Sequence, residues 1–435
     1  MIEWWVVLIL VFSSLLIFLM TGLPIFVCFM LINIVCVLVL IGTNGLGLFI
    51  NSMTETTLID ALVSIPLFIM LGELMFRTGG FQRLFKALDV LVGAIPGRLY
   101  VVSIGVAAVM GAISGSALAS VAILGRFVYP TMVERGCDKR LAIGTILSGA
   151  TLDAIIPPSI IGVILATLVG LSISDFLIAG MGPGITLAIC FAGYAVIRVL
   201  INPSLDSQRQ ESSSDQKGSK LEALIGVLPL VVTIFLVLGL VMMGVADTSE
   251  AAAVGIVGCL IMSFMYRTFS FKMLAEAGFE TMLTTAGVLA IISSSKLFSE
   301  VLAFSGAPAG LVQFTINMNL SPYVFYWVMM AVVFVLCMFI DQVALMLILV
   351  PIYLPLVQSF GFDPLWFWMM FLINILFGGI TPPLGYTLFV FKSAVPSLPL
   401  GEVYRAVWPM IYVAIVAVIL MTFFPKIVTF LPSLF

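Results

Sequence analysis

The chain is a series of long apolar runs separated by short polar turns. Runs of about 20 apolar residues are long enough to cross the hydrocarbon core of a bilayer as a helix. The pattern therefore predicts an all-α polytopic membrane protein. The predicted helices cover residues 4–20, 24–41, 57–76, 141–170, 177–200, 224–245, 249–266, 281–300, 364–395 and 407–424.

Composition supports this interpretation. Of 435 residues, 62% are hydrophobic and 9% are charged, whereas about 25% of the residues in an average soluble domain are charged. An outer-membrane β-barrel would instead show short segments of alternating hydrophobicity. The net charge of -3 and the absence of a basic cluster give no indication of a nucleic-acid partner. The lipid bilayer is the expected surroundings.

One segment, residues 202–222, has the polar composition of a linker, so it divides the chain into halves at 1–201 and 223–435. The halves can be laid over each other with a shift of 225 residues. Several prolines, glycines and an aspartate in one register indicate an internal duplication. The matched pairs are Pro130 with Pro355, Gly136 with Gly361, Asp138 with Asp363, and Pro157-Pro158 with Pro382-Pro383.

Each half contains a proline pair inside an apolar run. Proline removes a backbone donor and clashes with the preceding turn, so two in a row break a helix. In lipid, the freed carbonyls are tolerated only where they face protein, water or an ion. Broken helices at corresponding places in two halves, here about 141–170 and 364–395, mark the binding site of a secondary transporter.

The basic residues differ sharply between the halves. Lys and Arg flank the stretch 99–128 on both sides. The segments of the second half that correspond to these two flanks, 302–323 and 351–365, contain neither Lys nor Arg. Short loops rich in Lys and Arg stay in the cytoplasm, so the halves are predicted to be inverted repeats and the linker to be cytoplasmic. The stretch 99–128 must then enter and leave from one side as a re-entrant hairpin. Its counterpart, 322–358, is predicted to enter from the outside.

Five stretches carry a family resemblance. The chain resembles the large membrane (M) subunit of TRAP transporters, the tripartite ATP-independent periplasmic transporters. The stretches are 113–119 (ISGSALA), 156–160 (IPPSI), 174–180 (SDFLIAG), 248–253 (TSEAAA) and 380–385 (ITPPLG).

The resemblance implies an elevator of the ion-transporter superfamily in the bacterial inner membrane. It implies Na⁺-driven uptake of a small organic acid, a carboxylate or a sulfonate. The expected partners are a small four-helix TRAP membrane subunit and a periplasmic substrate-binding protein.

The resemblance also implies two sodium sites, each between a hairpin tip and a broken helix. Sodium prefers oxygen ligands, and the C-terminal ends of half-helices offer carbonyls. The first half would contribute Ser114, Gly115, Asp153, Ile156 and Pro157. The second half would contribute Cys337, Gly378, Thr381 and Leu384. Two positions depart from the family pattern, since a glycine is usual near Asp153 and common at Cys337.

Four residues are candidates for binding the substrate anion: Ser116, Ser120, Ser159 and Asp341. Ser159 follows a break, where the amides at a helix N-terminus attract anions. Alternatives stand beside these roles. Small tip residues also allow close helix packing, Ser120 could bond between helices, and Asp341 could cap the second helix of its hairpin.

Other functional classes find little support. The chain has no histidine, its six cysteines are scattered without a CxxC pair, and it has neither a GxSxG nor a GxxxxGK[ST] motif. An intramembrane enzyme or an ATP-driven pump is therefore not expected. The competing hypothesis is a self-sufficient sodium/anion symporter of the related architecture.

Overall fold

The structure, a computed structural model, describes residues 3–58, 60–79, 83–84, 87–89, 95–114, 117–157, 159–206, 220–383 and 385–434. Within these ranges the regular structure is helical, apart from one isolated β-bridge between Cys137 and Asp206. The prediction of an all-α protein is confirmed. The linker residues 207–219 lie outside the described residues.

The first half contains ten labelled helices among its described residues. They are α1 (Trp4–Met20), α2 (Ile25–Leu40), α3 (Gly47–Thr57), α4 (Ser64–Arg77), α6 (Arg98–Ser114), α7 (Ala117–Ile123), α8 (Tyr129–Glu134), α9 (Lys139–Ala150), α10 (Ile160–Val169) and α11 (Ile173–Ile201).

The described part of the second half contains another ten. They are α12 (Lys220–Met242), α13 (Thr248–Met265), α14 (Phe271–Phe304), α15 (Ala307–Asn317), α16 (Pro322–Cys337), α17 (Gln342–Ser359), α18 (Pro364–Gly378), α19 (Tyr386–Ala394), α20 (Leu400–Phe423) and α21 (Lys426–Thr429).

Both halves contain helices that could cross a membrane. Among the described residues, six helices are long and apolar enough to cross a bilayer, namely α11, α12, α13, α14, α17 and α20. Shorter apolar helices, such as α1 and α16, accompany them. A chain with this many apolar helices is a multi-pass membrane protein.

The predicted helix 57–76 is wrong in its first part. Helix α3 ends at Thr57 and a short 3-10 turn, Asp60–Val63, precedes α4, which begins at Ser64. The sequence before the turn is Thr54-Glu55-Thr56-Thr57. β-Branched threonines lose side-chain freedom in a helix, and their hydroxyls compete for backbone bonds, which accounts for the interruption.

Corresponding turns in the two halves have the same local structure. Gly136 and Gly361 both adopt a left-handed backbone, with φ of 78° and 67°, a conformation that glycine adopts at little cost. Two residues later Asp138 caps α9 by accepting from the Leu141 amide, and Asp363 caps α18 by accepting from the Trp366 amide. This correspondence fits the proposed duplication.

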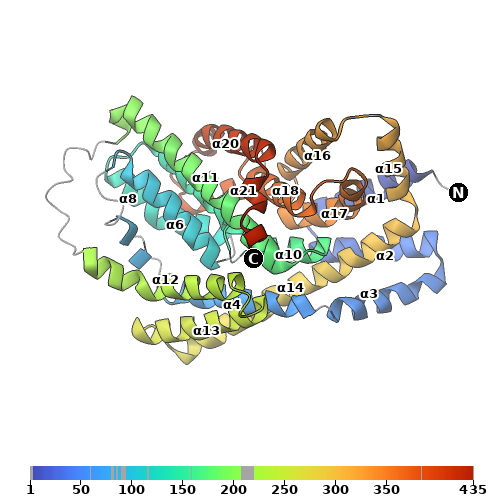
Figure 1. Ribbon diagram of the computed structural model, residues 1–435, viewed down its shortest axis with the longest axis horizontal. Helices are drawn as coiled ribbons and strands as arrows, with labels where there is room; N and C mark the ends of the chain where they lie inside the picture. The colour runs from blue at the N-terminus through green and yellow to red at the C-terminus, as the bar shows by residue number, and fades with distance from the viewer. Residues whose placement is uncertain are drawn as a thin grey trace.

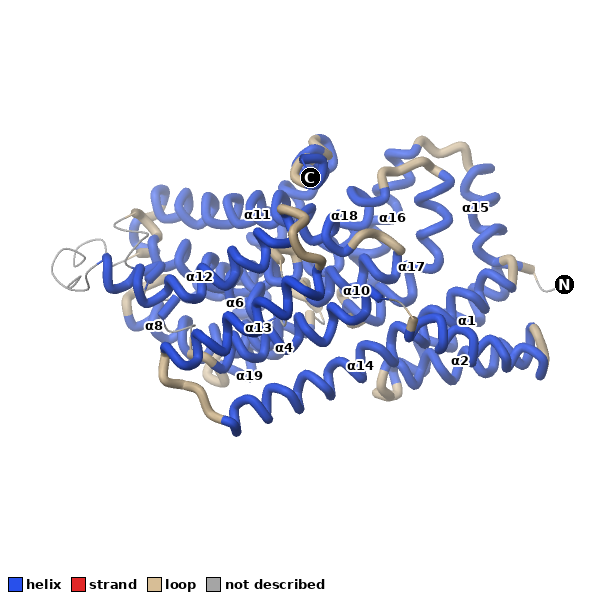
Figure 2. The backbone as a smooth tube through the Cα atoms, turned by 60° about the horizontal axis from the view of Figure 1, so that its bottom comes forward, coloured by secondary structure: helices blue, strands red, loops and turns tan. Residues whose placement is uncertain are grey.

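Two groups of helices make up the molecule (Figure 1). A flank of α2, α3, α4, α12, α13 and α14 runs along one side, where α14 packs on α2, α3 and α4, and α13 packs on α4 and α12. The remaining body contains α6, α9, α11 and α20, which pack on one another, and α16 with α18. Helix α14 has 34 residues, so it is roughly 50 Å long at 1.5 Å per residue; Figure 2 shows it along the edge of the molecule.

Candidate functional site

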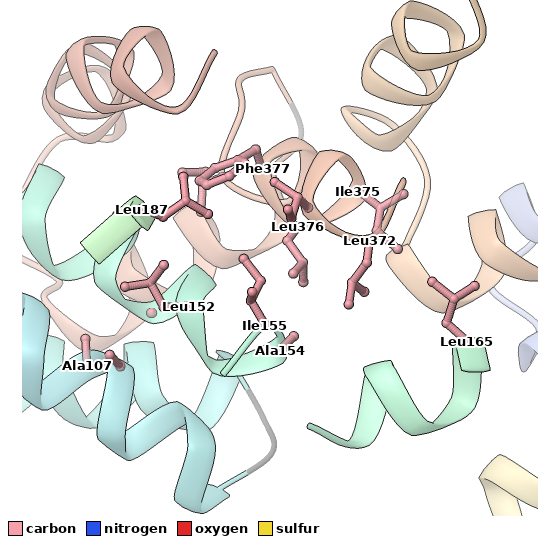
Figure 3. Packing of buried hydrophobic residues seen from close by; sticks show 14 of the residues in the cluster. Ala107, Leu152, Ala154, Ile155, Leu165, Leu187, Leu372, Ile375, Leu376 and Phe377 are labelled. Carbon is pink, nitrogen blue, oxygen red and sulfur yellow. The ribbon is translucent and has the colours of Figure 1, made fainter. Parts of the chain in front are cut away.

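The chain leaves the helix at both proline pairs, and the two breaks are neighbours. After α9 a 3-10 turn, Thr151–Ala154, leads to the first break, and the second break lies between α18 and α19. Figure 3 shows Leu152 and Ile155 of the first break close to Leu376 and Phe377 at the end of α18. Residues from the two halves of the chain thus meet in one buried region.

Ser159 holds the first break in shape. Its hydroxyl donates to the Ala154 carbonyl at 2.6 Å and accepts from the Gly162 amide at 2.9 Å. The side chain is buried. It therefore joins the end of one half-helix to the start of the next, a use of the hydroxyl that the sequence did not predict.

Helix α11 approaches the first break through glycines. A β-carbon on Gly180 would lie 2.2 Å from the Ile155 carbonyl oxygen, and one on Gly184 would lie 2.4 Å from the Ile156 Cγ1. No larger residue fits at either place without movement of the break. The predicted sodium-site residue Ile156 therefore packs against α11, whose glycines let the backbone come close.

Pro157 lies on the other side of the same break. It borders a small apolar gap together with Phe68 of α4 and Val237 and Val241 of α12. The contact between the first break and the flank is thus apolar.

Asp153 is the most unusual residue of the first break. It is 1% exposed, and within the described residues neither carboxylate oxygen accepts a hydrogen bond. A buried charge without a partner is costly in a membrane. A small bare cation at these oxygens would offset that cost.

The second break is held by three hydroxyl groups. Thr381 Oγ1 donates to the Phe377 carbonyl at 2.7 Å, and Thr387 Oγ1 donates to the Gly379 carbonyl at 2.6 Å. From α20, the Tyr404 hydroxyl donates to the Pro383 carbonyl at 2.6 Å. The Thr381 oxygen still has lone pairs after this donation, so the geometry permits it to ligate a cation.

The tip of the second hairpin packs directly on this break. A β-carbon on Gly378 would lie 1.5 Å from the Cys337 Sγ, and the thiol donates to the Phe334 carbonyl at 3.2 Å. The two predicted sodium-site residues Cys337 and Gly378 are therefore in direct contact.

Asp341 caps α17. Its carboxylate accepts from the backbone amides of Val343 at 2.9 Å and Ala344 at 3.4 Å. The capping role considered for Asp341 is thus the one that the structure shows, and the residue is exposed at the hairpin tip. Ser120, the remaining described substrate candidate, is buried in α7.

Some predicted site residues cannot be placed. Gly115, Ser116 and Leu384 lie outside the described residues, and Ser114 is described only as the last residue of α6.

Sequence reasoning missed three polar residues beside the second break: Asn374, Gln342 and Tyr386. The Asn374 amide donates to the Met330 carbonyl at 2.6 Å. The sequence alone could have singled out Asn374, because its amide is the one uncharged polar side chain of this type in the otherwise apolar α18. Gln342 and Tyr386 both lie beside Gly379, since a β-carbon there would be 2.9 Å from Gln342 Nε2 and from Tyr386 Cε1, a relationship that only the folded chain reveals.

A multi-pass helical membrane protein with two adjacent helix breaks in its core has the architecture of a membrane transporter. The model of the tripartite ATP-independent periplasmic transporter family, DctM component, matches residues 12–427. The chain belongs to this family, as the resemblance implied. It is a transporter permease subunit and not an enzyme.

Curated relatives agree with this assignment. The chain is 31% identical to the C4-dicarboxylate TRAP transporter large permease protein DctM of Pseudomonas aeruginosa, over 87% of this chain and 88% of that protein. It is 29% identical to the sialic acid TRAP transporter large permease protein SiaM of Vibrio cholerae, over 91% and 92%. It is 28% identical to the ectoine/5-hydroxyectoine TRAP transporter large permease protein UehC of Ruegeria pomeroyi, over 86% of both.

Solved structures support the fold. The YdaH transporter of Alcanivorax borkumensis has a TM-score of 0.61 at 13% identity, over 88% of this chain and 90% of that one. MtrF of Neisseria gonorrhoeae has a TM-score of 0.59 at 12% identity, over 88% and 84%. At such identities the likeness concerns the fold alone.

Proposed function

We propose that this chain carries a small organic acid, a carboxylate or a sulfonate, across the bacterial inner membrane, driven by sodium. It works as the transport subunit of a tripartite system with a small four-helix membrane subunit and a periplasmic substrate-binding protein. Relatives named for C4-dicarboxylates, sialic acid and ectoine support an organic acid, because all of these molecules carry carboxylates.

The observation that carries the sodium proposal is Asp153. Its two buried oxygens lack partners within the described chain, and none of the ion pairs of the described residues involves it. Both oxygens are sealed from water-sized molecules, so a bare monovalent ion suits them better than a bulky substrate group. Sodium, a hard cation, matches carboxylate and carbonyl oxygens.

The division into flank and body supports an elevator. The flank contacts the first break through apolar side chains around Pro157, so movement of the body would break no hydrogen bond at that contact. The two inverted repeats then provide equivalent inward- and outward-facing arrangements around one pair of sites. In this proposal the breaks and hairpins move together past α4, α12 and α14.

Reconstitution into liposomes tests the proposal. The chain is incorporated with and without the small subunit, and the binding protein is added outside with radiolabelled succinate, ectoine or N-acetylneuraminate. Uptake that needs an inward sodium gradient and both partners is expected. Uptake by the chain alone would favour the self-sufficient symporter, and uptake that persists with choline in place of sodium would contradict sodium coupling.

A further inference from the structure

A groove lies between α11 and α20 on the surface of the body. Its volume is about 560 Å³, and its walls are apolar and aromatic side chains of these two helices. Both helices are long and apolar enough to cross a bilayer, and Figure 1 shows α20 on the side of the molecule opposite the flank. The lining residues Ile189, Ile197 and Val416 are exposed. The groove therefore opens outward from a surface that crosses the membrane.

A glycine and a proline hollow out this α11–α20 groove. Gly193 of α11 has no side chain, and a β-carbon there would meet nothing within 4 Å. Pro409 belongs to the wall that α20 contributes, and it cannot donate to the carbonyl four residues earlier, that of Arg405. The groove thus has room for an apolar chain, with a backbone acceptor left open one turn beyond Pro409.

The two helices are antiparallel, so their arginines lie at the same end of the groove. A β-carbon on Gly182, in the first half of α11, would collide with the carbonyl oxygen of Ile427, which follows α20. The end of α20 is therefore beside the first half of α11, and the start of α20 is beside the end of α11. Arg198 lies in the last turn of α11, and Arg405 lies one turn before Pro409.

Neither arginine forms an ion pair within the part of the chain that the structure describes. Both are exposed, and the ion pairs of the described residues involve neither of them. The guanidinium carbon of Arg198 lies 6.0 Å from the centre of the Tyr194 ring, and Tyr194 lines the groove. The one acidic residue of α20, Glu402, does not pair with Arg405. This end of the groove therefore offers positive charge to a ligand.

An apolar groove that ends at two arginines matches an anionic phospholipid. The planar guanidinium group binds phosphate oxygens through two parallel hydrogen bonds, and basic pockets between membrane helices bind anionic head groups. The predicted topology places this end in the cytoplasm, and the cytoplasmic leaflet carries the negative surface charge of the membrane. A helix of a partner protein could cover the apolar walls, but it would need carboxylates of its own for the two arginines.

We propose that the α11–α20 groove binds one anionic phospholipid. An acyl chain lies along Gly193 and Pro409, and the phosphate lies between Arg198 and Arg405. The site is separate from both helix breaks, because none of their residues lines the groove. The lipid contacts the same helix, α11, that packs on the first break through Gly180, so its binding stabilises the body of the protein.

Thermal unfolding of the purified, delipidated full-length chain in a non-ionic detergent tests this. Dioleoylphosphatidylglycerol, dioleoylphosphatidylcholine and glycerol 1-phosphate are titrated separately. The anionic lipid is expected to stabilise the protein at the lowest concentration, and glycerol 1-phosphate, which has no acyl chain, is expected to have no effect. Arg198→Gln and Arg405→Gln should each raise the half-saturating concentration of phosphatidylglycerol roughly fivefold, the contribution of one basic residue that faces anionic lipid. Their response to phosphatidylcholine should be that of the wild type.

Three further variants separate the parts of the site. Arg198→Lys keeps the charge and should retain most of the affinity. Gly193→Leu has room for its side chain, so the protein should fold, but the leucine fills the groove and should weaken binding of both lipids. Arg267→Gln, in the exposed turn after α13, is the matched control and should behave as wild type.

Equal stabilisation of the wild type by the two lipids would overturn the proposal, as would normal phosphatidylglycerol binding by both arginine-to-glutamine variants. Stabilisation by glycerol 1-phosphate as strong as by the lipid would show a site for free anions instead. If Gly193→Leu binds both lipids normally but no longer assembles with the small membrane subunit, the groove holds a helix of that subunit and the lipid proposal is wrong.

Discussion

The sulfur of Cys337 fills the space that any side chain at residue 378 would need. The distance from the Cys337 Sγ to a β-carbon built on Gly378 would be 1.5 Å, and the Cys337 Cβ would be 2.4 Å away. The hairpin tip and the end of α18 are therefore locked together by one thiol and one glycine.

Gly378→Ala is expected to destabilise the protein by about 1–3 kcal/mol, the usual cost of overpacking a core. Adding Cys337→Gly to this variant should restore most of the loss, because it removes the sulfur that the new methyl group meets. Thermal unfolding of the two single variants and the double variant in detergent measures the coupling. A Gly378→Ala protein as stable as the wild type would contradict the packing described above.

Ser159→Ala is expected to lower stability by about 1–2 kcal/mol, because it removes a helix cap together with a buried bond to the Ala154 carbonyl. Ser159→Thr keeps the hydroxyl and should cost less. Ser172→Ala is the matched control, since Ser172 caps α11 at an exposed position. Equal losses in Ser159→Ala and Ser172→Ala would show that the bond across the break contributes nothing.

The location of the breaks could be predicted because proline pairs act locally. Pro157 and Pro382 interrupt a helix wherever they occur in one, and caps such as Asp138 and Asp363 act within a single turn. The sequence therefore indicated where each half-helix ends.

The contacts between elements could not be predicted in the same way. Gln342 and Tyr386 are 44 positions apart and meet only because the hairpin packs on the break. The hydroxyl of Ser159 was expected to face an anion, yet it donates a hydrogen bond to the nearby Ala154 carbonyl. Partners of this kind depend on which helix faces pack together, and a periodic apolar pattern leaves that choice open.

The predicted topology can be tested at Ser204 and Gln313, which are both exposed. The distribution of Lys and Arg places the linker in the cytoplasm and the segment 302–323 outside. In a cysteine-free background, Gln313→Cys should react with a membrane-impermeant maleimide on intact spheroplasts, whereas Ser204→Cys should react only after permeabilisation. Reaction of residue 313 from the cytoplasmic side alone would rule out inverted repeats.

Thr381 provides the sharpest test of the sodium sites. Its hydroxyl hydrogen is engaged by the Phe377 carbonyl at 2.7 Å, so the oxygen presents its lone pairs to the break. Thr381→Val keeps the shape and removes this oxygen. If one hydroxyl ligand contributes about 1–2 kcal/mol, as hydrogen bonds to charged groups do, the half-saturating sodium concentration for transport should rise roughly fivefold to thirtyfold.

Thr381→Ser retains the hydroxyl and should keep the wild-type sodium curve, which distinguishes the loss of a ligand from a packing defect. Ser114→Ala is expected to act in the same way on the first site, and the cooperativity with sodium should fall if two ions accompany each acid. Surface level is measured alongside, because poor assembly lowers the maximal rate without moving the sodium curve. An unchanged curve in both Thr381→Val and Ser114→Ala would leave backbone carbonyls and Asp153 as the remaining ligands, since these oxygens are unaffected by either substitution.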